Sequence, residues 1–182
     1  SMSTSGNVMR LAAEELEASD LVTVVDSANL STGIGLLVIE AAIMAEKGQY
    51  AAEIAATIES LKPNVRASFV VDTLTYLYRG GRCNAVSAMA GGVLRLHPKI
   101  VVENGAMDAS KKYRGKINSV IMSYVKDMEE DLKSARPERV FITHSGCDRD
   151  TVNAVRSYLE SFGIFHEILE TRAGGVVSSH CG

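Results

Sequence analysis

A Gly-Gly-Arg turn at residues 80–82 has the residue types needed to hold an anion close to the backbone. Gly80 and Gly81 permit positive φ angles and leave room for a ligand to approach the main chain. Arg82 offers a planar fork of N–H donors that matches a carboxylate or phosphate in two parallel hydrogen bonds. A glycine cap at the end of a helix, followed by a surface arginine, explains the same residues without a ligand. The motif alone leaves both interpretations open.

Two further features could complete such a site. Gly91 and Gly92 interrupt an apolar segment, where each glycine in a helix costs about 1 kcal/mol relative to alanine. Close packing of that helix on a sheet, or a slot for an alkyl chain, would offset the cost, and the sequence favours neither. His180 follows residues 176–179, which we predict as a strand, and ligands of α/β sheets gather at strand ends. A histidine there donates a hydrogen bond or moves a proton, although an ordinary surface histidine is the plainer interpretation.

The charge balance along the chain favours an anionic ligand that is not nucleic acid. The segment from Arg79 to Lys116 contains eight basic and two acidic residues, a balance of +6 in a chain whose total is −3. A basic, glycine-rich turn beside an apolar segment suits a ligand with an anionic head and an apolar tail. The basic residues lack interleaved aromatic residues, so we do not expect nucleic-acid binding.

Other reactive residue types lack the spacing of a known site. His144, Cys147, His180 and Cys181 could supply four zinc ligands, but no Cys-x-x-Cys pair anchors them, and we expect no metal. The sequence has no motif that would support a Cys/His nucleophile pair. It also contains no phosphate-binding loop, so it gives no indication of a nucleotide cofactor. Three cysteines without framework spacing favour reduced thiols in a cytoplasmic protein.

Composition and charge divide the chain into two parts. The apolar fraction of 46% is enough for a core. The sequence has no run of 18 apolar residues, so we expect no membrane-spanning helix, and no secretory signal is visible. Residues 1–64 carry a net charge of −6 and residues 65–182 a net charge of +3. The change falls at the Lys62-Pro63 step, where proline ends a helix. We therefore predict an incomplete first α/β domain at residues 1–63 and a second at 64–182.

The hydrophobic pattern predicts an α/β fold with a mixed sheet. In the first domain we expect helices at 8–18 and 50–62, an apolar and buried helix at 34–44, and a strand at Leu21–Val25. One strand cannot form a sheet, so this domain is expected to be incomplete. In the second domain the expected strands are 65–71, 99–103, 139–144, 165–170 and 176–179, and the expected helices are 73–78, 84–96, 115–135 and 148–162. Asn104-Gly105 predicts a hairpin, which requires an antiparallel pair.

Taken in order, several of these segments resemble the DegV family, which includes the fatty-acid-binding subunit of bacterial fatty acid kinase. The most specific segment is Phe69–Arg82, which resembles the family's strand, Leu-rich helix and Gly-Gly-Arg. Gly92–Ile100 is similar to its glycine-to-proline stretch, Ser3–Gly6 to a serine-rich loop, and Ser179–Gly182 to the start of its closing His-x-Gly-Pro-Gly motif. The resemblance implies a two-domain α/β architecture that buries a long-chain fatty acid.

The same resemblance implies roles for individual residues. The family holds the carboxylate with loop hydroxyls of the first domain, where Ser5 falls, and Arg82 and His180 match an arginine and a histidine near the head group. Those two residues are linked to phosphoryl transfer with the fatty acid kinase catalytic subunit. The family's chain starts before Ser3 and continues past Gly182, so a fragment is expected. The alternative is an enzyme on a small anionic metabolite, with Arg82 as anion clamp and His180 as acid/base.

Overall fold

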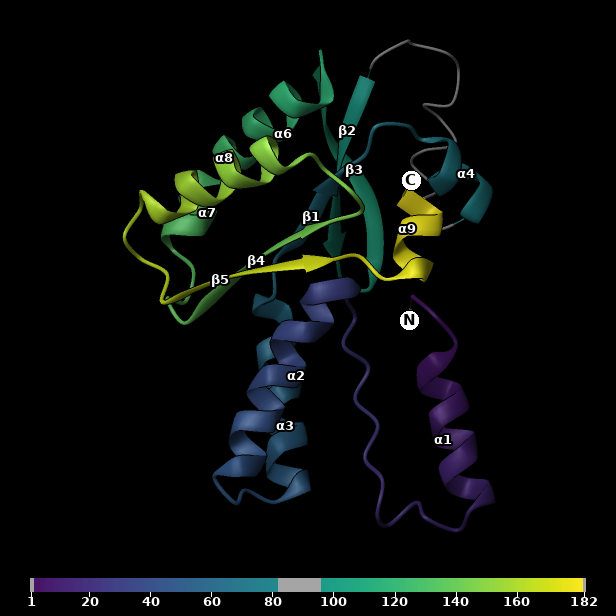
Figure 1. The fold of residues 1–182 in the computed structure, drawn as a ribbon. Helices are drawn as coiled ribbons and strands as arrows, with labels where there is room; N and C mark the ends of the chain where they lie inside the picture. Colours follow the sequence, from purple (N-terminus) through teal and green to yellow (C-terminus); the bar gives the residue numbers. More distant parts are fainter. Residues whose placement is uncertain (1, 82–95, 182) are drawn as a thin grey trace. The chain divides into compact units, whose positions relative to one another are not determined.

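The computed structural model describes residues 2–81 and 96–181 of the chain (Figure 1). These residues belong to two compact units, the first formed by Ser1–Ala67 with Val102–Met107 and the second by Ser68–Val101 with Asp108–Gly182. The predicted domain boundary between residues 63 and 64 stays a proposal, because compactness within this chain does not decide how the whole fold divides.

The first unit is built from helices. They are α1 Ser5–Glu15, α2 Ser31–Glu46 and α3 Ala51–Leu61, followed by a 3-10 turn, η1 Lys62–Asn64. Helices α2 and α3 pack against each other. The ammonium group of Lys62 donates a hydrogen bond of 2.7 Å to the backbone carbonyl of Asp26, which ties the end of α3 to the segment before α2.

The predicted strand at Leu21–Val25 is wrong. Residues 22–27 have no regular secondary structure, and the side chain of Leu21 is 86% exposed. A strand exists only where its backbone N–H and C=O groups bond to a neighbour, and the described part of the chain places no strand beside this segment. The run of apolar residues is present, but no strand among the described residues pairs with it.

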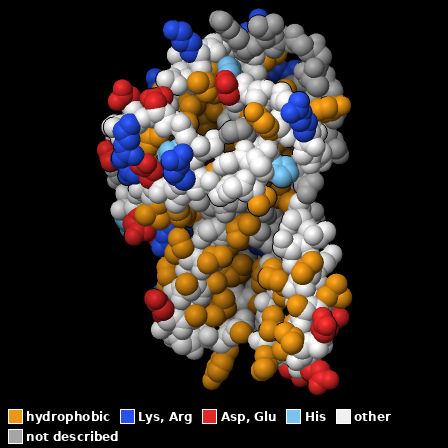
Figure 2. Space-filling view, turned by 45° about the vertical axis from the view of Figure 1, so that its right-hand side comes forward, with side chains coloured by type: hydrophobic (Ala, Val, Ile, Leu, Met, Phe, Trp, Pro, Cys, Tyr) orange, Lys and Arg blue, Asp and Glu red, His pale blue; other side chains and the backbone are white. Residues whose placement is uncertain are grey.

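The first unit exposes many large apolar side chains, which Figure 2 shows as orange areas over its helices. The exposed residues are Val8, Met9, Leu11, Leu16, Leu21, Val22, Ile34, Val38 and Tyr50. Within α2, which the sequence predicted to be buried, only Gly33 and Leu37 are buried. Apolar surface on this scale marks a face that contacts something else.

The strands form two sheets. The first contains β1 Ala67–Val70, β2 Leu96–Glu103 and β3 Ala106–Arg114 in the order β1-β2-β3, and the second contains β4 Arg139–His144 and β5 Glu167–Arg172 as a parallel pair. The hairpin predicted at Asn104-Gly105 joins β2 and β3, with φ angles of 51° and 74° that match a type I′ turn. The prediction of an α/β fold is confirmed. Among the described residues, the hairpin and the parallel pair belong to different sheets.

The helices of the second unit enclose a small core. They are α4 Thr75–Gly80, α6 Ile117–Lys126, α7 Glu129–Lys133, α8 Arg149–Glu160 and α9 Gly175–Cys181. Helices α6, α7 and α8 lie along one side of the β4–β5 pair (Figure 1). Val125, Val155 and Leu159 are buried at the centre of this layer. Helix α8 begins as predicted, because the carboxylate of Asp148 accepts a hydrogen bond of 2.9 Å from the Thr151 amide.

Two predicted elements of the second unit are wrong. Residues 176–179 are helical rather than extended, because Ser178 donates its backbone N–H to the carbonyl of Gly174, four residues earlier. The single helix predicted at 115–135 is two helices, α6 and α7, separated at Asp127 and Met128. The predicted helix at 84–96 lies outside the described residues except for Leu96, which begins β2. None of the helices that the structure describes has the length and apolar character needed to cross a membrane.

Candidate functional site

The structure brings His180 of α9 against Gly80, the first glycine of the Gly-Gly-Arg turn. Helices α4 and α9 pack together, although about a hundred residues separate them in the chain. A Cβ atom built on Gly80 would stand 2.3 Å from Cδ2 and 3.0 Å from Nε2 of the His180 ring. Only a glycine leaves room for the imidazole at this position. The sequence left open whether the glycines here admit a ligand or cap a helix, and in the structure Gly80 makes room for the histidine.

The turn itself is set by helix α4. Leu77 is fully buried and anchors the helix, while Gly81 ends it in the left-handed conformation with φ of 61°. The Gly81 amide donates to the carbonyl of Tyr78 at 3.1 Å. The predicted glycine cap is therefore present. Helix α4 begins two residues later than predicted, at Thr75.

The hydrogen bonds of His180 fix which ring nitrogen faces outward from its own helix. Nδ1 lies 2.8 Å from the carbonyl of Val176, one helical turn earlier, and 3.3 Å from Oγ of Ser179. A carbonyl oxygen only accepts, so Nδ1 carries the proton and donates it. The Ser179 hydroxyl also donates to the Val176 carbonyl at 2.8 Å. Nε2 is then the atom that accepts a proton, or donates one when the ring is charged.

The other predicted site residues cannot all be placed beside His180. Arg82, Gly91 and Gly92 lie outside the described residues. Ser5 is the first residue of α1, and its amide contacts the hydroxyl of Ser3 at 3.3 Å near the exposed surface. Ser5 and His180 belong to different units, so their proximity stays a prediction.

The basic segment is partly neutralised by its own neighbours. Lys111 donates to the carboxylate of Asp127, which also accepts a hydrogen bond of 2.7 Å from the Tyr113 hydroxyl. The Lys111 hydrogen bond, followed by that of Tyr113, holds the pKa of Asp127 below its ordinary value. The ammonium of Lys99 lies 5.7 Å from the centre of the Tyr124 ring, in cation–π range. These contacts join β2 and β3 to α6 and reduce the charge available to a ligand.

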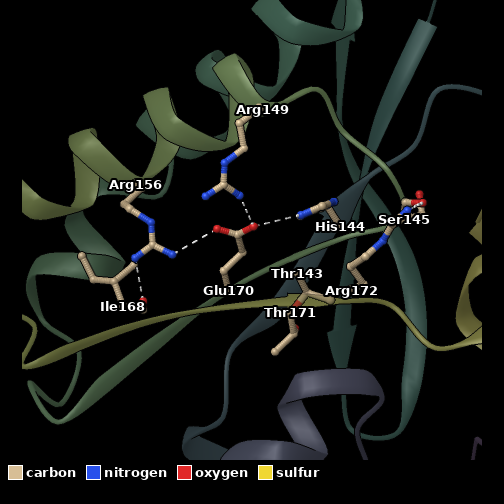
Figure 3. A network of polar contacts seen from close by, with 9 residues as sticks. All are labelled: Thr143, His144, Ser145, Arg149, Arg156, Ile168, Glu170, Thr171 and Arg172. Carbon is tan, nitrogen blue, oxygen red and sulfur yellow. Dashed lines mark hydrogen bonds and ion pairs between the residues drawn. The ribbon is translucent and has the colours of Figure 1, made fainter.

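A second polar cluster surrounds Glu170 on β5 (Figure 3). The guanidinium of Arg149 donates to one carboxylate oxygen at 2.6 Å, and that of Arg156 donates to the other at 3.2 Å. Arg156 also donates to the carbonyl of Ile168 at 2.8 Å. These arginines, Arg156 first, lower the pKa of Glu170. Both arginines belong to α8, so we assign this cluster to holding that helix on the sheet.

His144 borders the Glu170 cluster at the end of β4. Its Nε2 lies 3.6 Å from the nearer oxygen of Glu170, which is an ion-pair distance rather than a hydrogen bond (Figure 3). Within the described ranges, no three His, Cys, Asp or Glu residues come close enough together to hold a metal ion. Burial raises the pKa of the Cys181 thiol, and partial burial with the charge of Asp148 raises that of Cys147. Raised pKa values keep both thiols neutral near pH 7, which disfavours a thiolate nucleophile.

One polar residue was missed by the sequence analysis. His97 is only 4% exposed, and its two ring nitrogens lie 3.2 Å from the carbonyl of Val71 and 3.0 Å from that of Gly115. The available signal was weak, a single histidine between Leu96 and Pro98. Buried polar groups are almost always hydrogen-bonded. A carboxylate oxygen of Asp72 lies 3.5 Å from Nδ1 of His97.

Comparison with protein families identifies the fold. The sequence model of the DegV family, described as an uncharacterised protein family, matches residues 1–182. The chain belongs to the DegV family. A DegV domain-containing protein of Deinococcus radiodurans is 34% identical over 175 residues, which cover 95% of this chain and 60% of the relative. A second, from Caldanaerobacter subterraneus, is 29% identical over 93% of this chain and 60% of the relative. The chain thus spans about 60% of the length of these DegV relatives.

Solved DegV structures share the fold over the full length of this chain. One from Thermus thermophilus, described as a fatty-acid-binding DegV protein, aligns with a TM-score of 0.80 and 30% identity, covering 100% of this chain and 64% of the other. One from Eubacterium eligens, loaded with heptadecanoic acid, aligns with a TM-score of 0.81 and 20% identity, covering 100% and 66%. Because the Eubacterium eligens protein is only 20% identical to this chain, the comparison with it supports the fold alone. The family resemblance and the α/β architecture inferred from the sequence are both confirmed.

Proposed function

We propose that this chain binds a long-chain fatty acid and presents its carboxylate to a separate fatty acid kinase catalytic subunit, which forms the acyl phosphate. Its own part is binding and orientation rather than catalysis. Membership of the DegV family supports this, as does its 30% identity to the Thermus thermophilus protein described as binding fatty acid. The observation that carries the proposal is the contact between His180 and Gly80 at the start of the Gly-Gly-Arg turn.

The proposed head-group site uses the ring nitrogen that His180 does not commit to its own helix. Nδ1 is held by the Val176 carbonyl, so Nε2 is available for chemistry on the Gly80 side. Neutral Nε2 accepts the proton of a carboxylic acid, and protonated Nε2 donates a hydrogen bond to the resulting carboxylate. Arg82, two residues after Gly80, would add a paired contact to the same anion, and Ser5 would add a hydroxyl.

The alkyl tail would supply most of the affinity. Burying a sixteen-carbon chain at about 0.8 kcal/mol per CH₂ gives roughly 12 kcal/mol before the costs of ordering. We propose that the absence of side chains at Gly91 and Gly92 leaves room for this tail. Head-group residues then select the orientation of the acid more than they determine its retention.

The first experiment asks what the protein carries. The full-length natural protein is purified, extracted with organic solvent and analysed by mass spectrometry. A stoichiometric long-chain acid is the expected result. Protein that carries no lipid, and takes up none when incubated with palmitate, would contradict the proposal and favour the alternative of an enzyme on a small anionic metabolite.

The second experiment separates orientation from retention. Arg82→Ala should lower the rate of acyl-phosphate formation by about a hundredfold while most bound fatty acid is retained, because the tail dominates affinity. Arg136→Ala is the matched control, since Arg136 is a surface arginine whose guanidinium pairs with neighbouring Glu138. A variant that loses fatty acid, but phosphorylates the remaining bound acid at the wild-type rate, would show that the role given to Arg82 is wrong.

Two features of the whole protein are also proposed. The free thiols of Cys147 and Cys181 favour a reducing compartment, so we propose a cytoplasmic location. We further propose that residues 1–63 and 64–182 belong to two domains of the DegV architecture. Limited proteolysis of the full-length protein near Lys62 tests this division, because a linker is cut faster than a packed element.

A further inference from the structure

His97 on β2 forms a bridge between two backbone carbonyls that belong to other segments. Its Nδ1 faces the carbonyl of Val71, just after β1, and its Nε2 faces the carbonyl of Gly115, just after β3. The distances of 3.2 Å and 3.0 Å are those of ordinary hydrogen bonds. The ring therefore links three successive strands of one sheet at a single level.

The partners of the ring show how the bridge is held. The charged group facing the ring is the carboxylate of Asp72, 3.5 Å from Nδ1, and the facing groups at Val71 and Gly115 are backbone oxygens. Every one of these atoms is an acceptor, so whichever ring nitrogen carries a proton has a carbonyl to which it can donate.

The bridge holds the start of the segment that carries the candidate site. Val71 is followed by three residues and then by α4, whose last residue, Gly80, contacts His180. This connection is short, and Leu77 of α4 is fully buried, so a shift at Val71 is expected to move a packed helix. We propose that His97 is a positioning residue, which by bridging the carbonyls of Val71 and Gly115 fixes the end of β1 and thereby the placement of Gly80 against His180. The expected effect on phosphoryl transfer rests on the proposed function, whereas the positioning of α4 by His97 does not.

The structural part of the inference is tested without any ligand. In the full-length protein, hydrogen exchange read by mass spectrometry should become about tenfold faster at residues 72–80 in His97→Phe, which removes both ring nitrogens and leaves two carbonyls unpaired. Exchange in β4 should remain at the wild-type rate. The lysine of His97→Lys keeps hydrogen-bond donors at this position, so this variant should restore the protection of residues 72–80.

A second histidine of the same unit provides the control variant. His166→Phe changes an exposed histidine of the same unit and should leave exchange at residues 72–80 unchanged. Exchange in His97→Phe that is unchanged at residues 72–80, or faster throughout the unit including β4, would overturn the positioning role.

The functional part is tested by comparing binding with delivery. His97→Phe should retain fatty acid but lower acyl-phosphate formation by about tenfold, and His97→Lys should recover most of that rate. Equal rates in wild type and His97→Phe would overturn the link to the site, even where exchange at 72–80 is faster. If the wild-type protein binds no fatty acid, the proposed function fails, while the exchange measurements still decide the role of His97.

Discussion

The contact between Gly80 and His180 makes a sharp prediction for Gly80→Ala. The new methyl carbon would begin 2.3 Å from Cδ2 of the ring, and ordinary contact begins near 3.4 Å, so the ring must move by about 1 Å. Its Nδ1 is held 2.8 Å from the Val176 carbonyl, and a movement of that size breaks the hydrogen bond. The substitution therefore displaces the one side chain that the candidate head-group site is built on.

The expected effect on stability is small because two contributions oppose each other. Alanine at the end of α4 gains about 1 kcal/mol over glycine, since Gly80 does not need a positive φ. Losing the hydrogen bond of His180 costs about 1 kcal/mol. Urea unfolding should show a change within about 1 kcal/mol, whereas misplacement by 1 Å should lower acyl-phosphate formation by about a hundredfold. Fatty-acid retention should change little.

A double-mutant cycle isolates the contact. In a His180→Ala background the added methyl meets no ring, so Gly80→Ala should stabilise the protein by about 1 kcal/mol, giving a coupling energy of similar size. Gly35→Ala in α2 is the matched control, because its methyl would meet only Thr32 at 3.9 Å and should stabilise by about 1 kcal/mol. If Gly80→Ala changes stability equally in both backgrounds, and phosphoryl transfer is unaffected, the contact does not exist as described.

Two further predictions concern side chains that hold the second unit together. Asp127→Asn should cost less than about 1 kcal/mol at pH 7, discounted for partial exposure, because Lys111 and Tyr113 bind the carboxylate. The pKa of Asp127 is lowered in the folded state, so this stability is present above the ordinary aspartate pKa and is lost as pH falls through the lowered one. The difference between wild type and variant in urea unfolding should shrink below pH 4, and a constant difference would contradict the assignment. Tyr124→Phe should cost about 1–3 kcal/mol in the same assay, because the buried hydroxyl donates to the Ser68 carbonyl at 2.7 Å. Burial raises the pKa of Tyr124 to about 12, so its ultraviolet titration should lie well above that of an exposed tyrosine.

The sequence predicted best those features that depend on neighbouring residues. Asn104-Gly105 defines a hairpin because both residues tolerate positive φ, and Asp148 caps α8 because its carboxylate reaches the Thr151 amide. The strand at 139–144 was predicted within its observed bounds, because a short apolar run between polar turns fits a buried strand. Each of these signals lies within a few residues of the feature that it specifies.

Predictions failed where a distant partner decides the structure. The run Leu21–Val25 has the composition of a buried strand, yet the described residues provide no strand to pair with it. The role of His97 depends on the carbonyls of Val71 and Gly115, and no spacing in the sequence reveals that they meet. The polar and apolar pattern shows which side chain or strand needs a hydrogen-bonding partner. It does not show which distant residue provides that partner.

The error at residues 176–179 bears directly on the proposed mechanism. On a strand, His180 would have no carbonyl of its own segment within reach of its ring, since neighbouring carbonyls point along the sheet. On helix α9 the carbonyl of Val176, four residues earlier, lies directly beneath the ring and accepts from Nδ1. The helix thus selects one tautomer before any ligand arrives, and it presents Nε2 toward the Gly80 turn. A histidine held in this way needs little reorganisation to receive a proton, which is what a head-group residue that orients a carboxylate for phosphoryl transfer requires.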